Sequence, residues 1–224
     1  MSDIRQAIEA VRERIDRACG IAGRDPAGVT LVAVTKTVDA ARVVEAIEAG
    51  LGDIGENYVQ EAKGKIEAIG PGRARWHMIG HIQSNKVKYI PSLFDCVHTV
   101  DSIAIMEGLE KRGKEMDILF EVNLAGEATK SGTDMEGLRR ILERALSLAH
   151  LKPVGLMTMP PYVEDPEEVR GMFRQLRTTL ETMNAEFGLA MRELSMGMSS
   201  DLEVAVEEGA TMVRIGTALF GERR

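Results

Sequence analysis

The feature that most constrains the fold is an alternation of short apolar segments with longer amphipathic ones, repeated eight times along 224 residues. The first short segment, 31–36, carries apolar residues on both faces, which is typical of a buried parallel strand. The longer segments between the short ones have the spacing of helices with one apolar face. The strand-like segments are 31–36, 53–57, 75–80, 96–100, 117–123, 153–158, 193–197 and 212–216. Strands that alternate with helices in this way predict a parallel sheet.

Eight such units predict an α/β protein folded as a single-domain (β/α)8 TIM barrel with an additional N-terminal helix. These barrels typically need about 250 residues, with a lower limit near about 200, so the chain has room for short loops and one domain. We expect residues 1–28 to contain the leading helix, over 3–19, and residues 29–221 to form the barrel. A doubly wound open sheet is the alternative, but Thr37-Val38-Asp39 follows the first strand where such sheets carry a glycine-rich turn.

Short polar patterns predict where several helices begin. Thr133 with Glu136, and Ser200 with Glu203, have the spacing of a capping box, and Asp165 is expected to cap the helix that follows it. The helices expected between the strands cover 39–50, 58–69, 84–89, 102–113, 134–149, 165–187 and 200–208.

Composition excludes several classes of protein. The net charge of −7 argues against a general role on nucleic acids or membrane surfaces. No apolar run approaches the roughly 20 residues that span a bilayer. Cys19 and Cys96 have no spacing that suggests metal or redox chemistry, and the N-terminus begins an amphipathic helix instead of a signal peptide. We therefore expect a cytoplasmic protein.

Lys36 stands at the carboxyl end of the first predicted strand, the edge where α/β barrels place their chemistry. A lysine held there can act as a Schiff-base nucleophile if its surroundings lower its pKa. The alternative is a strand-end lysine that points into water.

Two small-residue loops near the end of the chain predict an anion site. Ser199 and Ser200 follow the seventh strand, and Gly216 and Thr217 follow the eighth. Phosphate sites in barrels are frequently formed by the loops after these two strands. Arg214 alternates with Gly216, so we expect it to point into the barrel mouth, where it touches a ligand or pairs with Glu121 or Asp53.

The other candidates have equally plain structural readings. Asn57, with Gln60 three residues later, can be an ordinary helix cap, and His81 lies in a polar loop. His77 and His81 lie on a strand and its exit, so metal-ligand spacing on a helix does not apply to them. His98 is expected in the core or barrel wall. A strand-end lysine facing a phosphate site is compatible with a pyridoxal-phosphate aldimine or with a sugar-phosphate Schiff-base aldolase, and position alone does not separate the two.

At this point the motifs resemble those of the pyridoxal phosphate homeostasis protein family, whose fold is the barrel domain of alanine racemase. The similar segments run in order from about residue 30 to the end of the chain. They are 34–36 (VTK), 55–61 (GENYVQE), 77–86 (HMIGHIQSNK), 130–132 (KSG), 155–159 (GLMTM), 194–201 (LSMGMSSD), 213–217 (VRIGT) and 220–221 (FG).

The resemblance implies pyridoxal 5′-phosphate (PLP) as a cofactor covalently bound to Lys36 as an aldimine. It implies that Arg214 lies beside the pyridine nitrogen, and it matches Lys130 to a loop lysine of the family. The resemblance further implies phosphate contacts from Ser199, Ser200, Gly216 and Thr217, and pocket walls from Asn57, His81 and Met157.

The resemblance also implies a PLP-binding protein of vitamin B6 homeostasis that buffers or delivers its cofactor, with apo PLP-dependent enzymes as recipients. An arginine at the ring nitrogen only donates hydrogen bonds, which weakens the ring as an electron sink. The chain ends soon after its eighth strand, and Tyr58, Tyr89 and Tyr162 do not match the second base of a racemase. We therefore expect no catalytic residues, no metal and a monomer. A weak PLP-dependent amino-acid racemase or lyase is the alternative.

Overall fold

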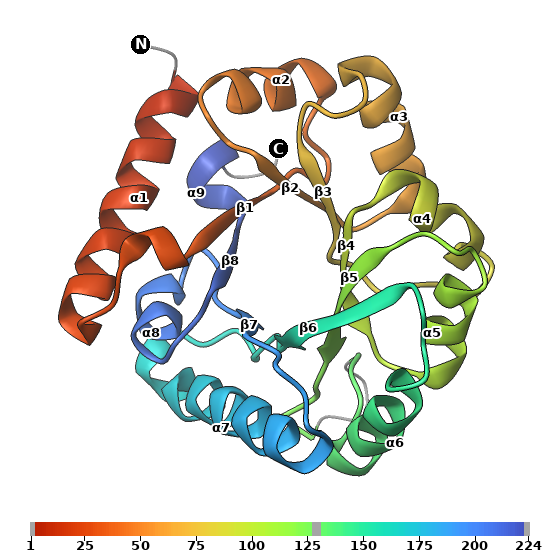
Figure 1. Cartoon of the computed structure of the whole chain (residues 1–224). Helices are drawn as coiled ribbons and strands as arrows, with labels where there is room; N and C mark the ends of the chain where they lie inside the picture. Colours follow the sequence, from red (N-terminus) through yellow and green to blue (C-terminus); the bar gives the residue numbers. More distant parts are fainter. Residues whose placement is uncertain (1–2, 127–130, 222–224) are drawn as a thin grey trace.

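The computed structural model describes residues 3–126 and 131–221, and in it eight parallel strands close into a barrel in sequence order (Figure 1). The strands are β1 (Thr30–Val34), β2 (Asp53–Glu56), β3 (Arg75–Met78), β4 (Cys96–Val100), β5 (Met116–Glu121), β6 (Leu151–Met157), β7 (Glu193–Ser195) and β8 (Met212–Ile215). β8 pairs with β1, so the sheet has no open edge. This arrangement confirms the predicted (β/α)8 barrel and rules out the open sheet.

Helices surround the barrel and connect successive strands (Figure 1). They are α1 (Asp3–Ala22), α2 (Ala40–Glu48), α3 (Val59–Ile69), α4 (Ile90–Leu93), α5 (Ile103–Glu110), α6 (Met135–Ala145), α7 (Arg170–Phe187), α8 (Leu202–Glu207) and α9 (Thr217–Phe220). Short 3-10 helices cover Pro26–Gly28, Val87–Tyr89 and Pro166–Val169. In the described part of the chain, no helix combines the length and the hydrophobicity needed to cross a membrane.

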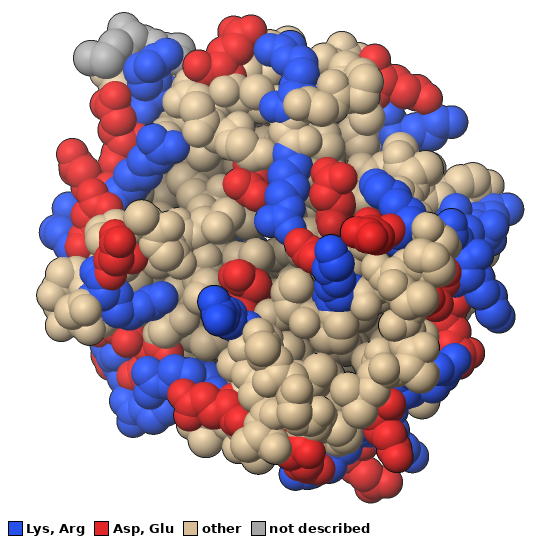
Figure 2. All heavy atoms as spheres, in the orientation of Figure 1, with Lys and Arg blue, Asp and Glu red and all other residues tan. Residues whose placement is uncertain are grey.

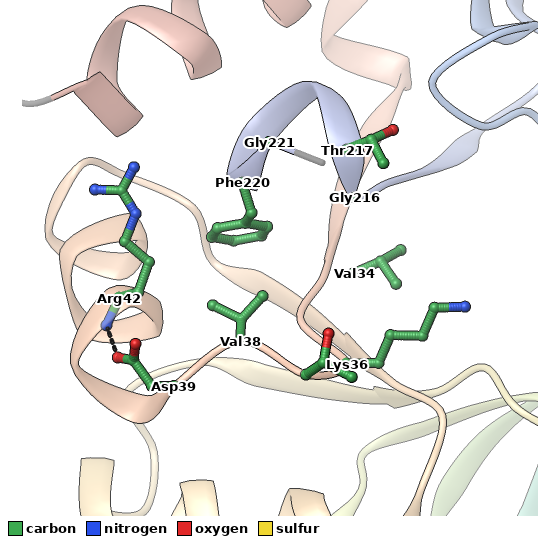
Figure 3. A pocket seen from close by; sticks show the side chains of 10 residues that line it. Val34, Lys36, Val38, Asp39, Arg42, Gly216, Thr217, Phe220 and Gly221 are labelled. Atoms are coloured by element: carbon green, nitrogen blue, oxygen red, sulfur yellow. Dashed lines mark hydrogen bonds between the residues drawn. The ribbon is translucent and has the colours of Figure 1, made fainter. Parts of the chain in front are cut away.

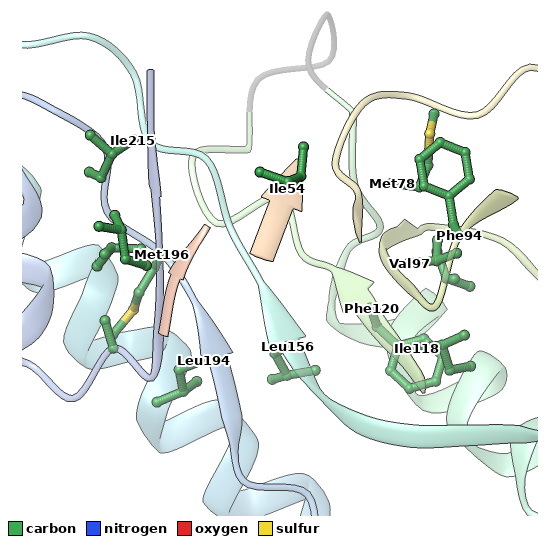
Figure 4. Packing of buried hydrophobic residues seen from close by; sticks show 14 of the residues in the cluster. Ile54, Met78, Phe94, Val97, Ile118, Phe120, Leu156, Leu194, Met196 and Ile215 are labelled. Atoms are coloured by element: carbon green, nitrogen blue, oxygen red, sulfur yellow. The ribbon is translucent and has the colours of Figure 1, made fainter. Parts of the chain in front are cut away.

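The strands divide the protein into two apolar regions because their side chains alternate between the two faces of the sheet. A small cluster inside the barrel consists of Val32, Cys96, Leu119, Met157 and Met212. A larger cluster fills the space between strands and helices, and Figure 4 shows members such as Ile54, Phe120 and Leu156. The barrel interior therefore holds this apolar cluster together with buried polar side chains such as His77, His98 and Ser195.

The leading helix α1 is three residues longer than predicted and packs against α8 and α9. Arg14 of this helix pairs with Glu203 at 2.6 Å and donates a hydrogen bond to the carbonyl of Ser199 at 3.0 Å. The N-terminal helix thereby contacts the loop after β7, which the sequence predicted as part of the anion site.

The predicted capping boxes are wrong. Asp134, one residue after Thr133, is the N-cap of α6, and its Oδ1 accepts from the N–H of Gly137 at 2.7 Å. Asp201 precedes α8, and its carboxylate bonds backward to the N–H of Met198, so Ser200 is left as an exposed turn residue.

Two further predicted helix starts have different outcomes. Asn57 is not a cap either, since Tyr58 occupies that position of α3 without a side-chain bond. Asp165 does cap, although what it begins is a 3-10 turn ahead of α7.

Charges of both signs are interspersed on the face shown in Figure 2, around the rim and close to its centre. On this face the net charge of −7 is therefore not gathered into one acidic field.

Candidate functional site

Lys36 lies at the carboxyl-end mouth of the barrel, two residues after the end of β1. Its half-buried side chain lines a cavity of about 720 Å³, a size typical of small-molecule sites (Figure 3). The walls come from two segments that are distant in sequence and adjacent in the closed barrel. They are Val34, Thr37, Val38, Asp39 and Arg42 after β1, and Gly216, Thr217, Phe220 and Gly221 after β8.

The backbone on both sides of Lys36 is tied to α3. The side chain of Lys65 donates to the carbonyl of Thr35 and to Glu61 Oε1, the latter at 2.7 Å. The same carboxylate oxygen accepts from the N–H of Thr37 at 2.5 Å. Thr37 has a positive φ of 65°, which is rare for a β-branched residue and persists only where its surroundings impose it. These bonds fix the direction in which Lys36 leaves the strand.

A buried ion pair anchors this arrangement. Lys65 Nζ lies 2.6 Å from Glu56 Oε1, and the side chains are 7% and 0% exposed. The hydroxyl of Thr35 donates to the same oxygen at 2.5 Å. Burial raises the pKa of Glu56, and the bonds from Lys65 and Thr35 oppose that rise. Because each charge is buried against its partner, loss of either one leaves the other uncompensated.

Arg214 points into the barrel from β8, as the sequence predicted, and it is buried. Its Nη1 donates to Ser195 Oγ at 2.6 Å, and its Nη2 donates to the carbonyl of Thr158 at 3.0 Å. Burial lowers the pKa of the guanidinium to about 10, while the charges of Glu121 and Asp201 oppose that change. Arg214 therefore stays charged at neutral pH. Among the described residues, Glu121 acts on it through its field and makes no hydrogen bond to it.

The two loops predicted to bind an anion lie next to each other. The N–H of Ala218 donates to Ser199 Oγ at 3.3 Å, which joins the loop after β7 to the start of α9. Gly216 and Thr217 line the Lys36 cavity, Ser199 is half-buried beside them, and Ser200 is exposed.

The remaining predicted residues are distributed more widely. Asn57 and His81 line a second cavity, of about 350 Å³, formed by the segments after β2 and β3. The Oδ1 atom of Asn57 is buried without a partner among the described residues, and His81 is largely exposed, 3.7 Å from Asp101. Met157 is buried inside the barrel. Lys130 lies outside the described residues.

Sequence reasoning missed several residues of the site. Asp39, Arg42 and Phe220 line the Lys36 cavity, and Lys65 and Glu61 bond to the backbone on either side of Lys36. Asp39 carried a usable signal, since it is the N-cap of α2 and a cap directly after a barrel strand lies at the carboxyl-end face. Lys65 carried none, because its pattern is that of an ordinary helical lysine.

Comparison with known proteins places these features in a family. The model of the alanine racemase N-terminal domain matches residues 7–224. The pyridoxal phosphate homeostasis protein of Aquifex aeolicus is 44% identical, over 98% of this chain and 98% of that protein. The protein of the same name from Pseudomonas aeruginosa is 45% identical, over 100% of this chain and 97% of that one.

Solved structures agree with these matches. PipY of Synechococcus elongatus PCC7942, solved with PLP bound, has a TM-score of 0.82 and 36% identity, over 93% of this chain and all of that one. Alanine racemase from Corynebacterium glutamicum has a TM-score of 0.69 at 16% identity, over 96% of this chain and 61% of that one, which shows a shared fold only.

Proposed function

This chain belongs to the pyridoxal phosphate homeostasis protein family, and from that premise we propose that it binds PLP through Lys36 and buffers or delivers it. The observation that carries the proposal is that Lys36 and the loop after β8 line the same cavity. A lysine amine in one cavity with a segment that can hold a phosphate is the minimum that such a cofactor requires. The relative solved with PLP bound has the same barrel over nearly the whole chain.

The residues present fit this group. PLP supplies an aldehyde for an amine and an aromatic ring that can delocalise negative charge. The side-chain amine of Lys36 would hold the aldehyde carbon of this group covalently. Ser199, Ser200, Gly216 and Thr217 would hold the phosphate, and Asn57, His81 and Met157 would contribute from the carboxyl ends of β2, β3 and β6. These assignments are part of the proposal. The bonds to the backbone of Thr35 and Thr37 support that of Lys36 because they fix the backbone from which its side chain enters the cavity.

We further propose that the protein is a carrier and not a catalyst. The pKa of Arg214 is about 10, so its guanidinium is charged at neutral pH and can only donate hydrogen bonds. Beside the pyridine nitrogen it would disfavour a proton there, which weakens the ring as an electron sink. A racemase also needs a second base. Among the described residues that line the Lys36 cavity there is no tyrosine, and Tyr58, Tyr89 and Tyr162 are exposed.

Absorption spectroscopy tests the binding. Titration of the purified protein with PLP is expected to give one visible band of a lysine-bound cofactor, absent in Lys36→Ala. The matched control is Lys152→Ala, which removes an exposed lysine at the amino end of β6 and keeps the band. A band that survives in Lys36→Ala contradicts the proposed linkage.

A second measurement separates the carrier from the alternative, a weak amino-acid racemase or lyase. Exchange of the α-proton is followed in deuterated water for a panel of amino acids. The carrier is expected to exchange no faster than free PLP, and sustained faster exchange identifies an enzyme. Delivery is tested by reactivation of an apo PLP-dependent enzyme, since transfer no faster than simple release into solution leaves only buffering.

A further inference from the structure

A chain of hydrogen bonds crosses the barrel interior and ends at Arg214. His77 Nε2 lies 2.8 Å from Asp53 Oδ1, and His77 Nδ1 lies 2.9 Å from His98 Nε2. His98 Nδ1 lies 2.8 Å from Ser195 Oγ, which accepts from Arg214 Nη1 at 2.6 Å. The five side chains come from β2, β3, β4, β7 and β8, and the three in the middle have no solvent exposure.

The two ends are different in kind. Asp53 is the first residue of β2, and its side chain is 26% exposed. It lines a cavity of about 370 Å³ at the amino end of the barrel. Arg214 lies toward the opposite mouth, where Lys36 stands. The chain therefore connects a solvent-accessible carboxylate at one end to a buried guanidinium at the other.

When both imidazoles are neutral, Arg214 and Asp53 at the two ends of the chain determine which atom donates in each hydrogen bond. Arg214 can only donate and an ionised Asp53 can only accept, while histidine and serine can do both. Each donor then points from Arg214 toward Asp53, and both histidines carry their proton on Nε2. Burial, reinforced by the field of His77 and of the cationic Arg214 and Arg75, holds the pKa of His98 well below its ordinary value.

We propose that Asp53, His77, His98 and Ser195 are positioning residues that hold Arg214 through this one-way chain. The inference rests on the proposed function, in which Arg214 faces the pyridine nitrogen of PLP. A buried guanidinium without a hydrogen-bonded carboxylate is costly. The aligned dipoles of the chain stabilise it and link it to the negative charge of Asp53, so the guanidinium stays fixed and charged before the cofactor arrives.

A metal ion is the competing explanation, because Cys96 Sγ and nitrogens of His77 and His98 lie within 4.8 Å of one another. Two observations favour the hydrogen-bonded chain. The ring nitrogens of both histidines already have partners at hydrogen-bond distance. Burial raises the pKa of the Cys96 thiol to about 12, which disfavours the thiolate that a metal requires.

Nitrogen-15 NMR of histidine-labelled protein without PLP tests the chain directly. We expect His77 and His98 each to carry a proton on Nε2 and to accept a hydrogen bond at Nδ1. A doubly protonated His77 overturns the proposal, because Ser195 would then accept from both sides and Arg214 would be uncoupled from Asp53. A stoichiometric transition metal retained by the purified protein overturns it as well. Since no PLP is present, these outcomes do not depend on the proposed function.

Two carboxylate variants test whether Asp53 acts on Arg214 along the chain. Asp53→Asn removes its charge, while Asp117→Asn is the matched control, since Asp117 has similar exposure and pairs with Arg75 outside the chain. We expect Asp53→Asn to move the nitrogen signals of both histidines and to weaken PLP binding about fivefold, the equivalent of one hydrogen bond. Asp117→Asn leaves both readouts unchanged. Equal effects of the two variants, or a change in Asp53→Asn confined to His77, contradict the positioning role.

Discussion

Glu121 offers a quantitative test of the electrostatics at the barrel mouth. It is the last residue of β5, its side chain is 3% exposed, and its Oε2 has no hydrogen-bond partner among the described residues. Burial, together with the negative charge of Asp101, raises the pKa of Glu121 to about 7, and the charge of Arg214 offsets part of that rise. An unperturbed glutamate titrates at 4.5.

The magnitude follows from the two pKa values. Their difference corresponds to about 3 kcal/mol of free energy of unfolding, at about 1.4 kcal/mol per pKa unit. Because the folded state binds the proton more tightly than the unfolded state, ionisation of Glu121 destabilises the fold as pH rises. The cost is absent below pH 4.5, grows between pH 4.5 and 7, and is complete above pH 7.

The variant Glu121→Gln keeps the shape of the side chain and cannot ionise. The free energy of unfolding of the variant and of the unchanged protein is measured by urea denaturation without PLP. The value for the variant minus the value for the unchanged protein is expected to increase by about 3 kcal/mol from pH 4.5 to pH 8.5. Glu115→Gln is the control, since Glu115 is 75% exposed and no such gain is expected. A difference between Glu121→Gln and the unchanged protein that is constant with pH, or that shrinks as pH rises, would refute the reasoning.

Two further substitutions test local contacts by chemical denaturation. Lys65→Met is expected to cost about 3 kcal/mol or more because it leaves Glu56 buried and unpaired, whereas Lys63→Met, on an exposed part of the same helix, changes stability by less than about 0.5 kcal/mol; equal costs would contradict the buried pair. Asp39→Ala is expected to cost about 1 kcal/mol, because the carboxylate accepts from the N–H of Arg42 at the start of α2, and Asp39→Asn should restore most of that loss. An unchanged stability in Asp39→Ala would show that the cap contributes nothing.

Prediction from sequence succeeded where a local pattern reports a local requirement. Each strand of the barrel is buried on both faces and each helix on one, so periodicity alone indicated eight strands in the correct order. The ends of elements were harder. Thr133 and Asp134 both fit an N-cap, and only the path of the chain out of β5 decides which oxygen reaches the first free N–H. The same competition explains the outcome at Ser200 and Asp201.

Some residues predicted for the candidate site share one cavity, and others line a different one. Lys36, Gly216 and Thr217 meet at one cavity because closure of the sheet makes β8 the neighbour of β1. Asn57 and His81, predicted for the same site, line a cavity on the next two segments. A strand-end position indicates the face of the barrel on which a residue lies but not which part of the rim it occupies.

The sequence by itself determined the barrel and the position of Lys36 at the carboxyl end of its first strand, because periodicity and chain order are written along the chain. Only the tertiary structure decided what surrounds that lysine and the buried arginine. Lys65 reaches the backbone beside Lys36 from a different element, and His77 meets His98 and Ser195 across the barrel interior. Such contacts depend on inward faces of several strands being brought within hydrogen-bond distance, which closure of the barrel achieves and no linear pattern records.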